Sequence, residues 1–382
     1  MEGFFLLMTP GPKLISFCVL CLAIAGCINP AMQQAAKKPV IAAIADTIPP
    51  KPLVDSTIHI AAVGDMMLGT AYPSSSGLPP DSGRNSFKEA LQDLRDADIS
   101  FGNLEGVLLD IGAPSAMKLK FRSKPYLFKM PEYYGGIFKD AGFDMLSVGN
   151  NHSNDFGLKG RDNTMKVLDS LGIHYAGLKT SPTKIFTLNG VKYGFCAFSP
   201  NSQTVSLLDI EGAKVIIKEL KQQSDIVIVS FHGGGEGVAF EHVTQSAESY
   251  KGERRGNVHA FAHAAIDAGA DVILGNGPHV SRAMELYKDR LIAYSLGNFC
   301  TYRSVSVDGV CGLAPLLKLR IDKKGRFLGG NIVSYRQSHD RGLQRDTLNR
   351  ASIRIKMLTE TDFGQPGLSI SEDGVIVPVA VN

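Results

Sequence analysis

The 382-residue sequence lacks an excess of charge of either sign. Its 40 lysine and arginine residues are balanced by 37 aspartate and glutamate residues, which leaves a formal net charge of +3. This balance excludes the basic footprint of a nucleic-acid-binding protein and a polybasic membrane surface, so no nucleic-acid partner is expected. Bulk disorder is also excluded, because apolar residues make up 44% of the chain and recur in short runs.

Motifs of two common enzyme classes are missing. No Gly-x-Ser-x-Gly segment occurs, which argues against a serine hydrolase of the α/β-hydrolase type. The glycine-rich segment 233–237 lacks the Gly-Lys-Ser/Thr ending of a phosphate-binding loop. A nucleotide site is therefore not expected at this segment.

The first residues contain an apolar run that is too short to span a membrane. The uncharged run 14–26 falls below the length of a transmembrane helix, but it suits the core of a signal peptide. It ends Ala25-Gly26-Cys27, which resembles a bacterial lipobox. We expect residues 1–26 to be a lipoprotein signal peptide and Cys27 to be lipidated; an ordinary signal peptide with an incidental cysteine is the alternative.

Residues 27–57 are rich in Ala, Pro, Lys and Gln, which predicts a disordered tether stiffened in part by polyproline geometry. A cysteine that carries several acyl chains anchors stably to a membrane. We therefore expect the body of the protein in the cell envelope, outside the cytoplasm, as a membrane-anchored lipoprotein.

From Ile58 onwards, short β-branched runs alternate with segments of helical pattern, which predicts an α/β architecture around a largely central sheet. The expected strands are residues 58–63, 98–101, 145–148, 193–198, 226–231, 272–274 and 291–295. The expected helices are residues 86–97, 132–141, 158–171, 213–222 and 257–268, and residues 314–321 and 327–335 are expected to form an antiparallel hairpin. We expect one domain over residues 58–357 and a loose C-terminal tail with one strand over residues 358–382.

Three cysteines fall within this domain. Cys196 lies in an apolar run and is expected to be a buried thiol. Cys300 and Cys311 flank a polar stretch; two free thiols and a disulfide formed in an oxidising compartment are both open.

Nearly every predicted strand is followed by a tight polar cluster beside a glycine. In open α/β sheets the carboxyl ends of the strands form the ligand crevice, and glycine lets the backbone turn sharply there. The clusters are Gly64-Asp65, Gly102-Asn103-Leu104-Glu105, Gly149-Asn150-Asn151-His152, His232-Gly233-Gly234-Gly235-Glu236, Gly275-Asn276-Gly277-Pro278-His279 and Leu296-Gly297-Asn298-Phe299. Their carboxylates, imidazoles and carboxamides form a mixed oxygen and nitrogen set that suits one or two divalent ions of Zn, Mn or Fe. Taken singly, each residue also has a structural explanation as a cap, a turn residue or a hydrogen-bonded histidine.

These motifs, in this order, resemble those of the CapA capsule-synthesis family. The match covers about residues 58–302 and includes Gly64-Asp65-Met66-Met67-Leu68-Gly69, Asn103-Leu104-Glu105, Asn150-Asn151-His152 with Asp155, and residues 275–280 and 294–299. The family is similar to poly-γ-glutamate synthesis proteins, and its fold resembles that of calcineurin-like metallophosphatases. The resemblance implies a four-layer α/β sandwich, a divalent-metal site and association with poly-γ-glutamate or a related envelope polymer.

The resemblance also implies roles for individual residues. The expected metal ligands are Asp65, Glu105, Asn151, His232 and His279. Asp65 is also counted as catalytic, and His152 is expected to face the substrate as an acid. The expected substrate-binding residues are Arg122, Asn103, Glu236 and Asn298. For Arg122, which would hold an anionic group, a surface salt bridge is the alternative.

Two positions depart from the family pattern. Met67 stands where a histidine of the first motif is usual, and Asn276 or Gly277 stands where the last motif commonly has one. One metal, loose binding, or recognition without hydrolysis are therefore alternatives to a two-metal site, although the Asn276 oxygen can still coordinate a hard cation. His259 and His263 are spaced i, i+4 on a predicted helix, but no glutamate follows His259, so structural roles are expected for them.

Two hypotheses of function follow from these patterns. The leading one is a lipid-anchored, metal-dependent, hydrolase-like protein that acts on, or helps to assemble, an anionic envelope polymer or a phosphoester substrate. The rival is a non-catalytic, membrane-tethered subunit that binds polymer or capsule-synthase partners. The polar clusters at the strand ends favour the first hypothesis, whereas the two missing imidazoles favour the second.

Overall fold

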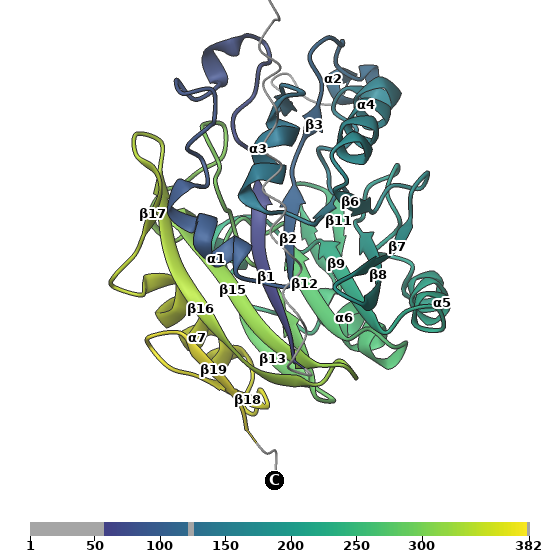
Figure 1. The fold of residues 1–382 in the computed structure, drawn as a ribbon, viewed down its shortest axis with the longest axis vertical. Coiled ribbons are helices and arrows are strands. Elements are labelled where there is room, and N and C mark those ends of the chain that lie inside the picture. The colour runs from purple at the N-terminus through teal and green to yellow at the C-terminus, as the bar shows by residue number, and fades with distance from the viewer. Residues whose placement is uncertain (1–56, 121–125, 380–382) are drawn as a thin grey trace, which may run out of the picture. The chain divides into compact units, whose positions relative to one another are not determined.

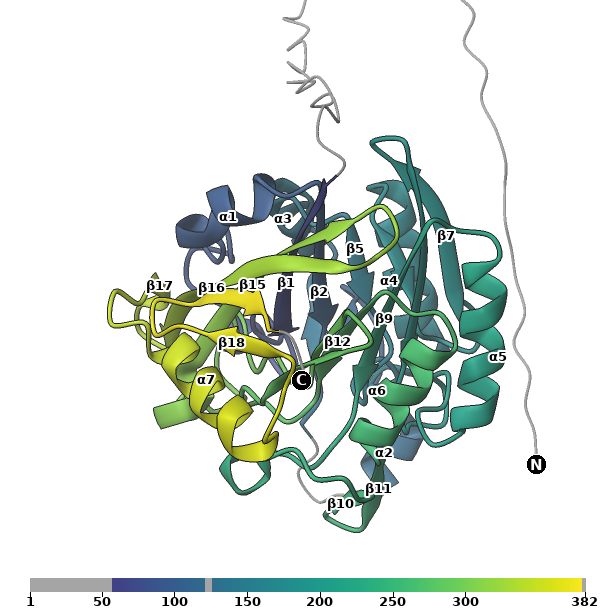
Figure 2. The same ribbon diagram turned by 90° about the horizontal axis from the view of Figure 1, so that it is seen from below.

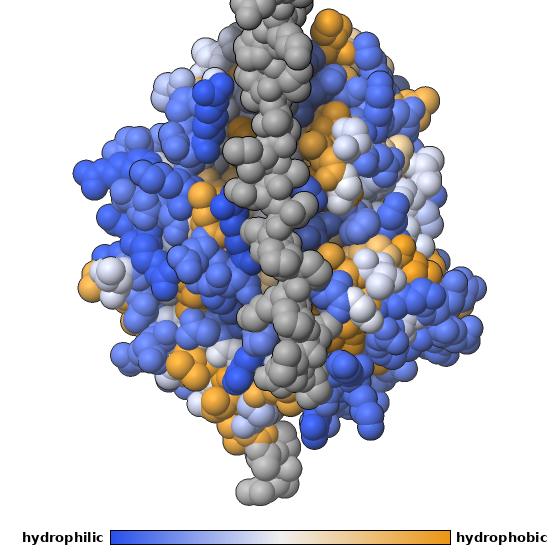
Figure 3. Space-filling view, viewed as in Figure 1, coloured by the Kyte–Doolittle hydropathy of each residue, from blue (hydrophilic) through white to orange (hydrophobic). Residues whose placement is uncertain are grey.

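A computed structural model describes residues 57–120 and 126–379 of the chain. The predicted signal peptide, Cys27, the tether up to residue 56, and Arg122 lie outside the described residues. Within the described ranges, no helix combines the length and the apolar character needed to cross a bilayer. Hydrophilic residues cover most of the described surface on the face drawn in Figure 3.

The first of two large sheets contains nine strands and is mixed (Figure 1). Its order is β18 (Leu368–Ile370), β19 (Val375–Pro378), β16 (Phe327–Ser338), β15 (Leu313–Asp322), β1 (Thr57–Met66), β2 (Ile99–Leu104), β5 (Met145–Ser147) and β6 (His174–Ala176), with β17 (Gly342–Arg345) paired to β16. The strands β1, β2, β5 and β6 run parallel, and Ile60 lies opposite Ile99. Their carboxyl ends therefore meet at one edge of the sheet.

The second large sheet contains six strands. Its order is β13 (Met284–Tyr287), β14 (Arg290–Ala293), β12 (Val272–Asn276), β9 (Ile226–His232), β8 (Val191–Phe198) and β7 (Thr183–Leu188). The four central strands are parallel, and β13 and β7 are antiparallel strands at the two edges. The register places His232 opposite Asn276, so these two polar residues end neighbouring strands.

The two sheets face each other across a common core, and helices cover their outer faces. Alternation along β1 shows this arrangement, because Ile60 points into the inter-sheet core and Ala61 into the core under the helices. The first sheet is covered by α1 (Leu91–Arg95), α3 (Tyr134–Ala141) and α4 (Gly157–Ser170), and the second by α5 (Ile210–Lys221) and α6 (Val258–Asp267). Figure 2 shows the strands between α1 and α3 on one side and α5 and α6 on the other. The predicted four-layer α/β sandwich is confirmed.

The predicted elements are observed with small shifts at their ends. Each predicted strand overlaps an observed one, and the predicted hairpin is the pair β15 and β16. Helices α5 and α6 begin at side-chain caps, where Asp209 accepts a hydrogen bond from the Gly212 N–H and Asn257 from the Ala260 N–H. The short elements are β3 (Val107–Leu108), β4 (Lys129–Met130), β10 (Glu248–Tyr250), β11 (Glu253–Gly256), α2 (Ala116–Lys120) and single turns at Ser75–Gly77, Lys88–Ala90, Val238–Phe240 and Gly309–Gly312.

The structure corrects the predicted loose tail after residue 357. This boundary falls inside α7 (Arg350–Asp362), whose Leu358 is fully buried. The following strands β18 and β19 pair with each other, and β19 extends the first sheet beyond β16. The segment is ordered because alternate apolar residues, Leu368, Ile370 and Ile376, are buried against the sheet.

The three cysteines of the body are buried free thiols. Of the two states considered for Cys300 and Cys311, the structure therefore has the unpaired one. The Cys300 thiol donates to the Ser86 carbonyl oxygen at 2.9 Å, and burial raises the pKa of both thiols above its ordinary value.

Candidate metal centre and cleft

The two sheets are joined at the carboxyl end of β1. The Asp65 N–H donates to the Gly297 carbonyl at 2.8 Å, and the Phe299 N–H donates to the Asp65 carbonyl at 2.8 Å. This contact requires glycine at position 64, because a Cβ atom there would lie 2.0 Å from the Gly297 oxygen. The strand ends of both sheets therefore meet around Asp65.

Two buried carboxylates and one imidazole form the centre of this junction. Oxygen and nitrogen atoms of Asp65, Glu105 and His279 lie within 4.8 Å of one another. His279 Nδ1 is 3.1 Å from Asp65 Oδ2, and His279 Nε2 is 3.5 Å from Glu105 Oε1. His279 has a φ of +58°, a conformation that non-glycine residues rarely adopt and that clusters at functional sites.

Several buried acceptor atoms around this centre have no hydrogen-bond partner. In the described part of the chain they include both oxygens of Glu105, Nε2 of His232, Oδ1 of Asn151 and Oδ1 of Asn276. Buried polar atoms in folded proteins are almost always paired, so a group of unpaired acceptors needs an explanation. Carboxylate, imidazole and carboxamide groups are ligands of divalent cations, and among them Asp65, Glu105 and His279 have ligand atoms close enough to share one ion.

The surrounding hydrogen bonds fix which atoms remain available. Asn103 donates through Nδ2 to Asp65 Oδ1 at 2.7 Å, and its Nδ2 also lies 3.4 Å from His232 Nδ1. Asn276 uses its Nδ2 group to donate to the Ser230 hydroxyl at 3.2 Å, which leaves its Oδ1 free. His232 and Asn276 therefore each present an unpaired atom, and both are fully buried.

The two departures from the family motif have different outcomes. Met67 is buried, and its sulfur accepts the Gly69 N–H at 3.2 Å, so the thioether is engaged in the local turn. Asn276, at the end of β12, stands where the family pattern commonly has a histidine. Its Oδ1 has no hydrogen-bond partner. Asn276 therefore leaves an oxygen available at its position, whereas the Met67 sulfur is already engaged.

Burial and crowding shift the pKa values of the central groups. Burial raises the pKa of Glu105 to about 8, opposed by His279 and reinforced by Asp65. Burial acts in the same direction on Asp65, but its contacts with His232 and His279 hold its pKa well below the usual range. Burial by itself would lower the pKa of His279, but the neighbouring carboxylates of Glu105 and Asp65 raise this pKa to about 10.

His152 is held by a carboxylate beside this centre. Its Nδ1 lies 2.8 Å from Asp155 Oδ2, and the other Asp155 oxygen is 2.9 Å from Lys118 Nζ. The ring stacks on Phe128 at 3.9 Å, and its Nε2 lies 3.8 Å from Glu105 Oε1. Burial lowers the pKa of His152, although Asp155 opposes this shift. The imidazole is thus fixed with Nε2 directed towards the metal ligands.

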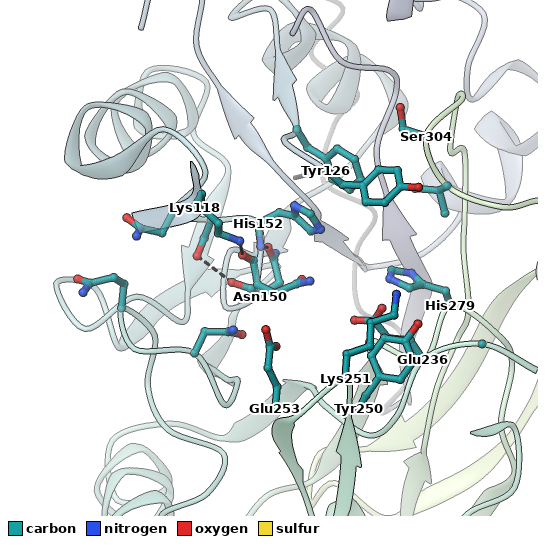
Figure 4. Close-up of a pocket in the computed structure, with 18 of the residues that line it drawn as sticks. Lys118, Tyr126, Asn150, His152, Glu236, Tyr250, Lys251, Glu253, His279 and Ser304 are labelled. Carbon is teal, nitrogen blue, oxygen red and sulfur yellow. Dashed lines mark hydrogen bonds between the residues drawn. The ribbon is translucent and has the colours of Figure 1, made fainter. Parts of the chain in front are cut away.

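A cavity of about 450 Å³ opens above these residues. Asn151, His152 and His279 line it, together with the side chains of Tyr126 and Tyr250 (Figure 4). Two of the expected metal ligands, Asn151 and His279, therefore face a pocket large enough for part of a polymer chain or a small phosphoester.

The predicted substrate-binding residues differ in their positions. Glu236 lines the cavity and pairs with Arg255 at 3.2 Å. Asn103 and Asn298 are fully buried and do not line it, so contact of their side chains with a substrate stays a prediction. Asn103 holds Asp65, and Asn298 lies with Oδ1 at 3.0 Å from His279 Nδ1, because both carboxamides turn beneath the strand ends.

Sequence reasoning missed the groups that support the site. Lys118 donates to the Asn151 carbonyl at 2.6 Å in addition to contacting Asp155. Arg282, fully buried, pairs with both oxygens of Glu248, and Glu248 Oε2 accepts the Gly235 N–H at 2.7 Å. No short motif marks these residues, because their roles depend on contacts between distant segments.

Comparison with known proteins gives the family. The model of the bacterial capsule synthesis protein family PGA_cap matches residues 59–303. The chain belongs to this family. The membership predicted from the strand-end motifs is thereby confirmed, and the matched region contains all the proposed metal ligands.

Three relatives are similar in sequence to this PGA_cap chain over part of their length. The PGA biosynthesis protein CapA of Bacillus subtilis is 28% identical over 272 residues, covering 67% of this chain and 66% of the relative. The capsule biosynthesis protein CapA of Bacillus anthracis is 30% identical over 180 residues (42% and 41%). An uncharacterized protein of Sinorhizobium fredii, y4uA, is 28% identical over 308 residues (63% and 65%). The chain spans less than two thirds of the length of each of these relatives.

Solved structures show weaker similarity. A hypothetical protein from Thermus thermophilus gives a TM-score of 0.45 at 16% identity, covering 74% of this chain and 100% of that chain. A 5'-nucleotidase precursor from the same organism gives 0.40 at 14% identity, covering 73% and 54%.

Proposed function

We propose that this PGA_cap protein is a lipid-anchored, extracytoplasmic, metal-dependent hydrolase that acts on an anionic envelope polymer such as poly-γ-glutamate. Family membership and the capsule and PGA biosynthesis relatives support the involvement of an envelope polymer. The Ala25-Gly26-Cys27 sequence supports the anchor. A divalent ion of Zn, Mn or Fe, with one or two ions bound, is the proposed cofactor.

The observation that carries this proposal is the cluster of Asp65, Glu105 and His279, in which both Glu105 oxygens are buried without a hydrogen-bond partner and His279 lines the cavity. The proposed ligands are Asp65, Glu105, Asn151, His232, Asn276 and His279. A divalent ion held there would polarise a phosphoryl or carbonyl oxygen and lower the pKa of a water molecule.

The chain's own residues supply the proton transfer. Asp155 accepts from His152 Nδ1, which leaves Nε2 as the atom that exchanges a proton with the substrate. In its protonated form, His152 gives the Nε2 proton to the leaving group. Lys118 neutralises the second Asp155 oxygen, so the carboxylate keeps one orientation. Glu236, and Arg122 outside the described residues, remain the proposed contacts to substrate.

Hydrolysis of defined substrates tests the enzymatic proposal. Purified protein loaded with Zn, Mn or Fe would be assayed on poly-γ-glutamate and on a generic phosphodiester. His152→Ala should lower the rate by about 10²-fold or more, the usual contribution of a general acid. The matched control is His59→Ala, which removes a partly exposed imidazole paired to Asp98 at the start of β1 and should leave the rate unchanged. Equal rates for His152→Ala and wild type would refute the catalytic role.

A non-catalytic, membrane-tethered subunit is the second candidate, because Met67 offers no replacement for the imidazole of the first motif. This alternative predicts binding of poly-γ-glutamate, or of capsule-synthase partners, with no turnover for any metal. Binding would then be unchanged in His152→Ala.

The anchor has a separate test. Growth with labelled palmitate should label the wild-type protein and leave Cys27→Ser unlabelled. An unlabelled wild-type protein would remove the lipid anchor from the proposal, and labelling of Cys27→Ser would exclude Cys27 as the lipidated residue; neither result would affect the metal site.

A further inference from the structure

A second group of metal-ligating side chains lies on the outer face of the second sheet. His259 and His263 are one turn apart on α6, and Glu285 is on β13. One ligand atom from each lies within 4.8 Å of the others. None of the three lines the cavity. Glu285 pairs across the strands with Ile292, whose side chain packs in the core shared with α6, so the carboxylate points towards this helix.

The two imidazoles and the carboxylate are oriented by their neighbours. His263 Nε2 is 2.9 Å from Glu285 Oε2, and the same oxygen accepts the Tyr294 hydroxyl at 2.7 Å. The His263 ring stacks on Tyr287 at 3.9 Å, which limits its rotation. The rings of His259 and His263 are 4.1 Å apart.

This arrangement is more specific than two histidines that only fill space. Two nitrogen donors at i, i+4 on one helix face and one carboxylate form a set that Zn²⁺ binds in proteins, with water in the fourth position. Tyr294 would act as the outer hydrogen-bond donor that holds a ligating carboxylate. The side chains are only partly exposed, at 24% for His263 and 13% for Glu285, so the pair is not an ordinary surface ion pair.

We propose that His259, His263 and Glu285 form a second divalent-metal site, of the zinc type, separate from the cleft. An ion there connects α6 to β13, the edge strand of the second sheet. Strand β13 is also joined to α7, since the Met284 N–H donates to the Thr359 hydroxyl at 3.0 Å. The site would therefore stabilise the outer helix layer against the sheet edge rather than take part in catalysis.

The experiment separates the second site from the first. The background variant Glu105→Gln/His232→Gln removes two ligands of the cleft site. After equilibrium dialysis against micromolar Zn²⁺ and removal of free metal, we expect this background to retain one zinc per chain by elemental analysis. Addition of His263→Gln should abolish that equivalent, and addition of Tyr294→Phe should weaken zinc binding by about tenfold.

Controls make each outcome decisive. His174→Gln in the same background is the matched control, because His174 is half-buried and stacks on Phe186 as His263 stacks on Tyr287. It should retain the zinc. If His263→Gln unfolds, Glu285→Gln, which keeps the side-chain shape, replaces it, and circular dichroism checks the fold. A background that binds no zinc, or zinc that persists in both ligand variants, would overturn the proposal.

Discussion

Replacement of Glu105 by glutamine should separate the stability of the protein from its response to metal. Both Glu105 oxygens are fully buried without a hydrogen-bond partner, and burial raises the pKa to about 8. Because the folded-state pKa lies above the unfolded one, the folded protein binds more protons between about pH 4.5 and 8. The unfolding free energy of the metal-free protein therefore falls as the pH rises through this window.

The size of the effect follows from removing that penalty. In chelator at pH 8, Glu105→Gln should be at least as stable as the wild type, because the amide is buried in the same way but does not titrate; the difference grows by on the order of 1 kcal/mol for each pH unit between about pH 4.5 and 8. Towards pH 4.5 the difference should shrink, because the wild-type carboxyl group is then protonated in both states.

Bound metal should make the wild type more stable than Glu105→Gln, the reverse of the order expected in chelator. At a free metal concentration about 1,000 times the dissociation constant, the wild type gains about 4 kcal/mol. If the variant binds about a hundredfold more weakly, it gains only about 1.4 kcal/mol at the same concentration. Urea denaturation measures the unfolding free energy of the wild type and the variant, with chelator and with metal, at pH 5 and at pH 8. A variant that is less stable than wild type in chelator at pH 8, or that gains as much from metal, would refute the reasoning.

Three other substitutions test the supporting contacts. Lys118→Met should lower the hydrolytic rate about tenfold at saturating metal, because Asp155 and the Asn151 backbone lose a common partner; a rate equal to that of the wild type would contradict this role. Burial raises the pKa of Asp144 to about 6, so Asp144→Asn should stabilise the protein by about 1–3 kcal/mol at pH 7 and have no such effect below about pH 4, measured by urea titration. Arg282→Met should destabilise it by about 3–5 kcal/mol in the same assay, because Glu248 is left buried and unpaired, and Glu248→Gln in addition should recover part of the loss.

The sequence was informative where local pattern and tertiary structure agree. Strand β9 begins with four consecutive β-branched residues, and it is buried on both faces as a central parallel strand. The polar clusters after such strands predicted the site, because parallel strands bring their carboxyl ends together. Asp65 and Asn103, which are 38 residues apart, accordingly lie opposite each other in register.

The remaining features depend on contacts that no local pattern contains. Glu285 joins His259 and His263 only because β13 pairs with β14 in one register, which turns the carboxylate towards α6. Asn298 follows a strand beside a glycine, as a ligand would, yet its side chain turns inward and holds His279. The periodicity of a short segment does not distinguish these outcomes.

Anomalous diffraction tests the central claim most directly. Crystals of the protein reconstituted with Zn²⁺ would be measured at the zinc absorption edge. The account predicts a peak at the junction of the two sheets, about 2.0–2.2 Å from ligand atoms of Asp65, Glu105 and His279. The absence of a peak at these residues in protein saturated with zinc would contradict it.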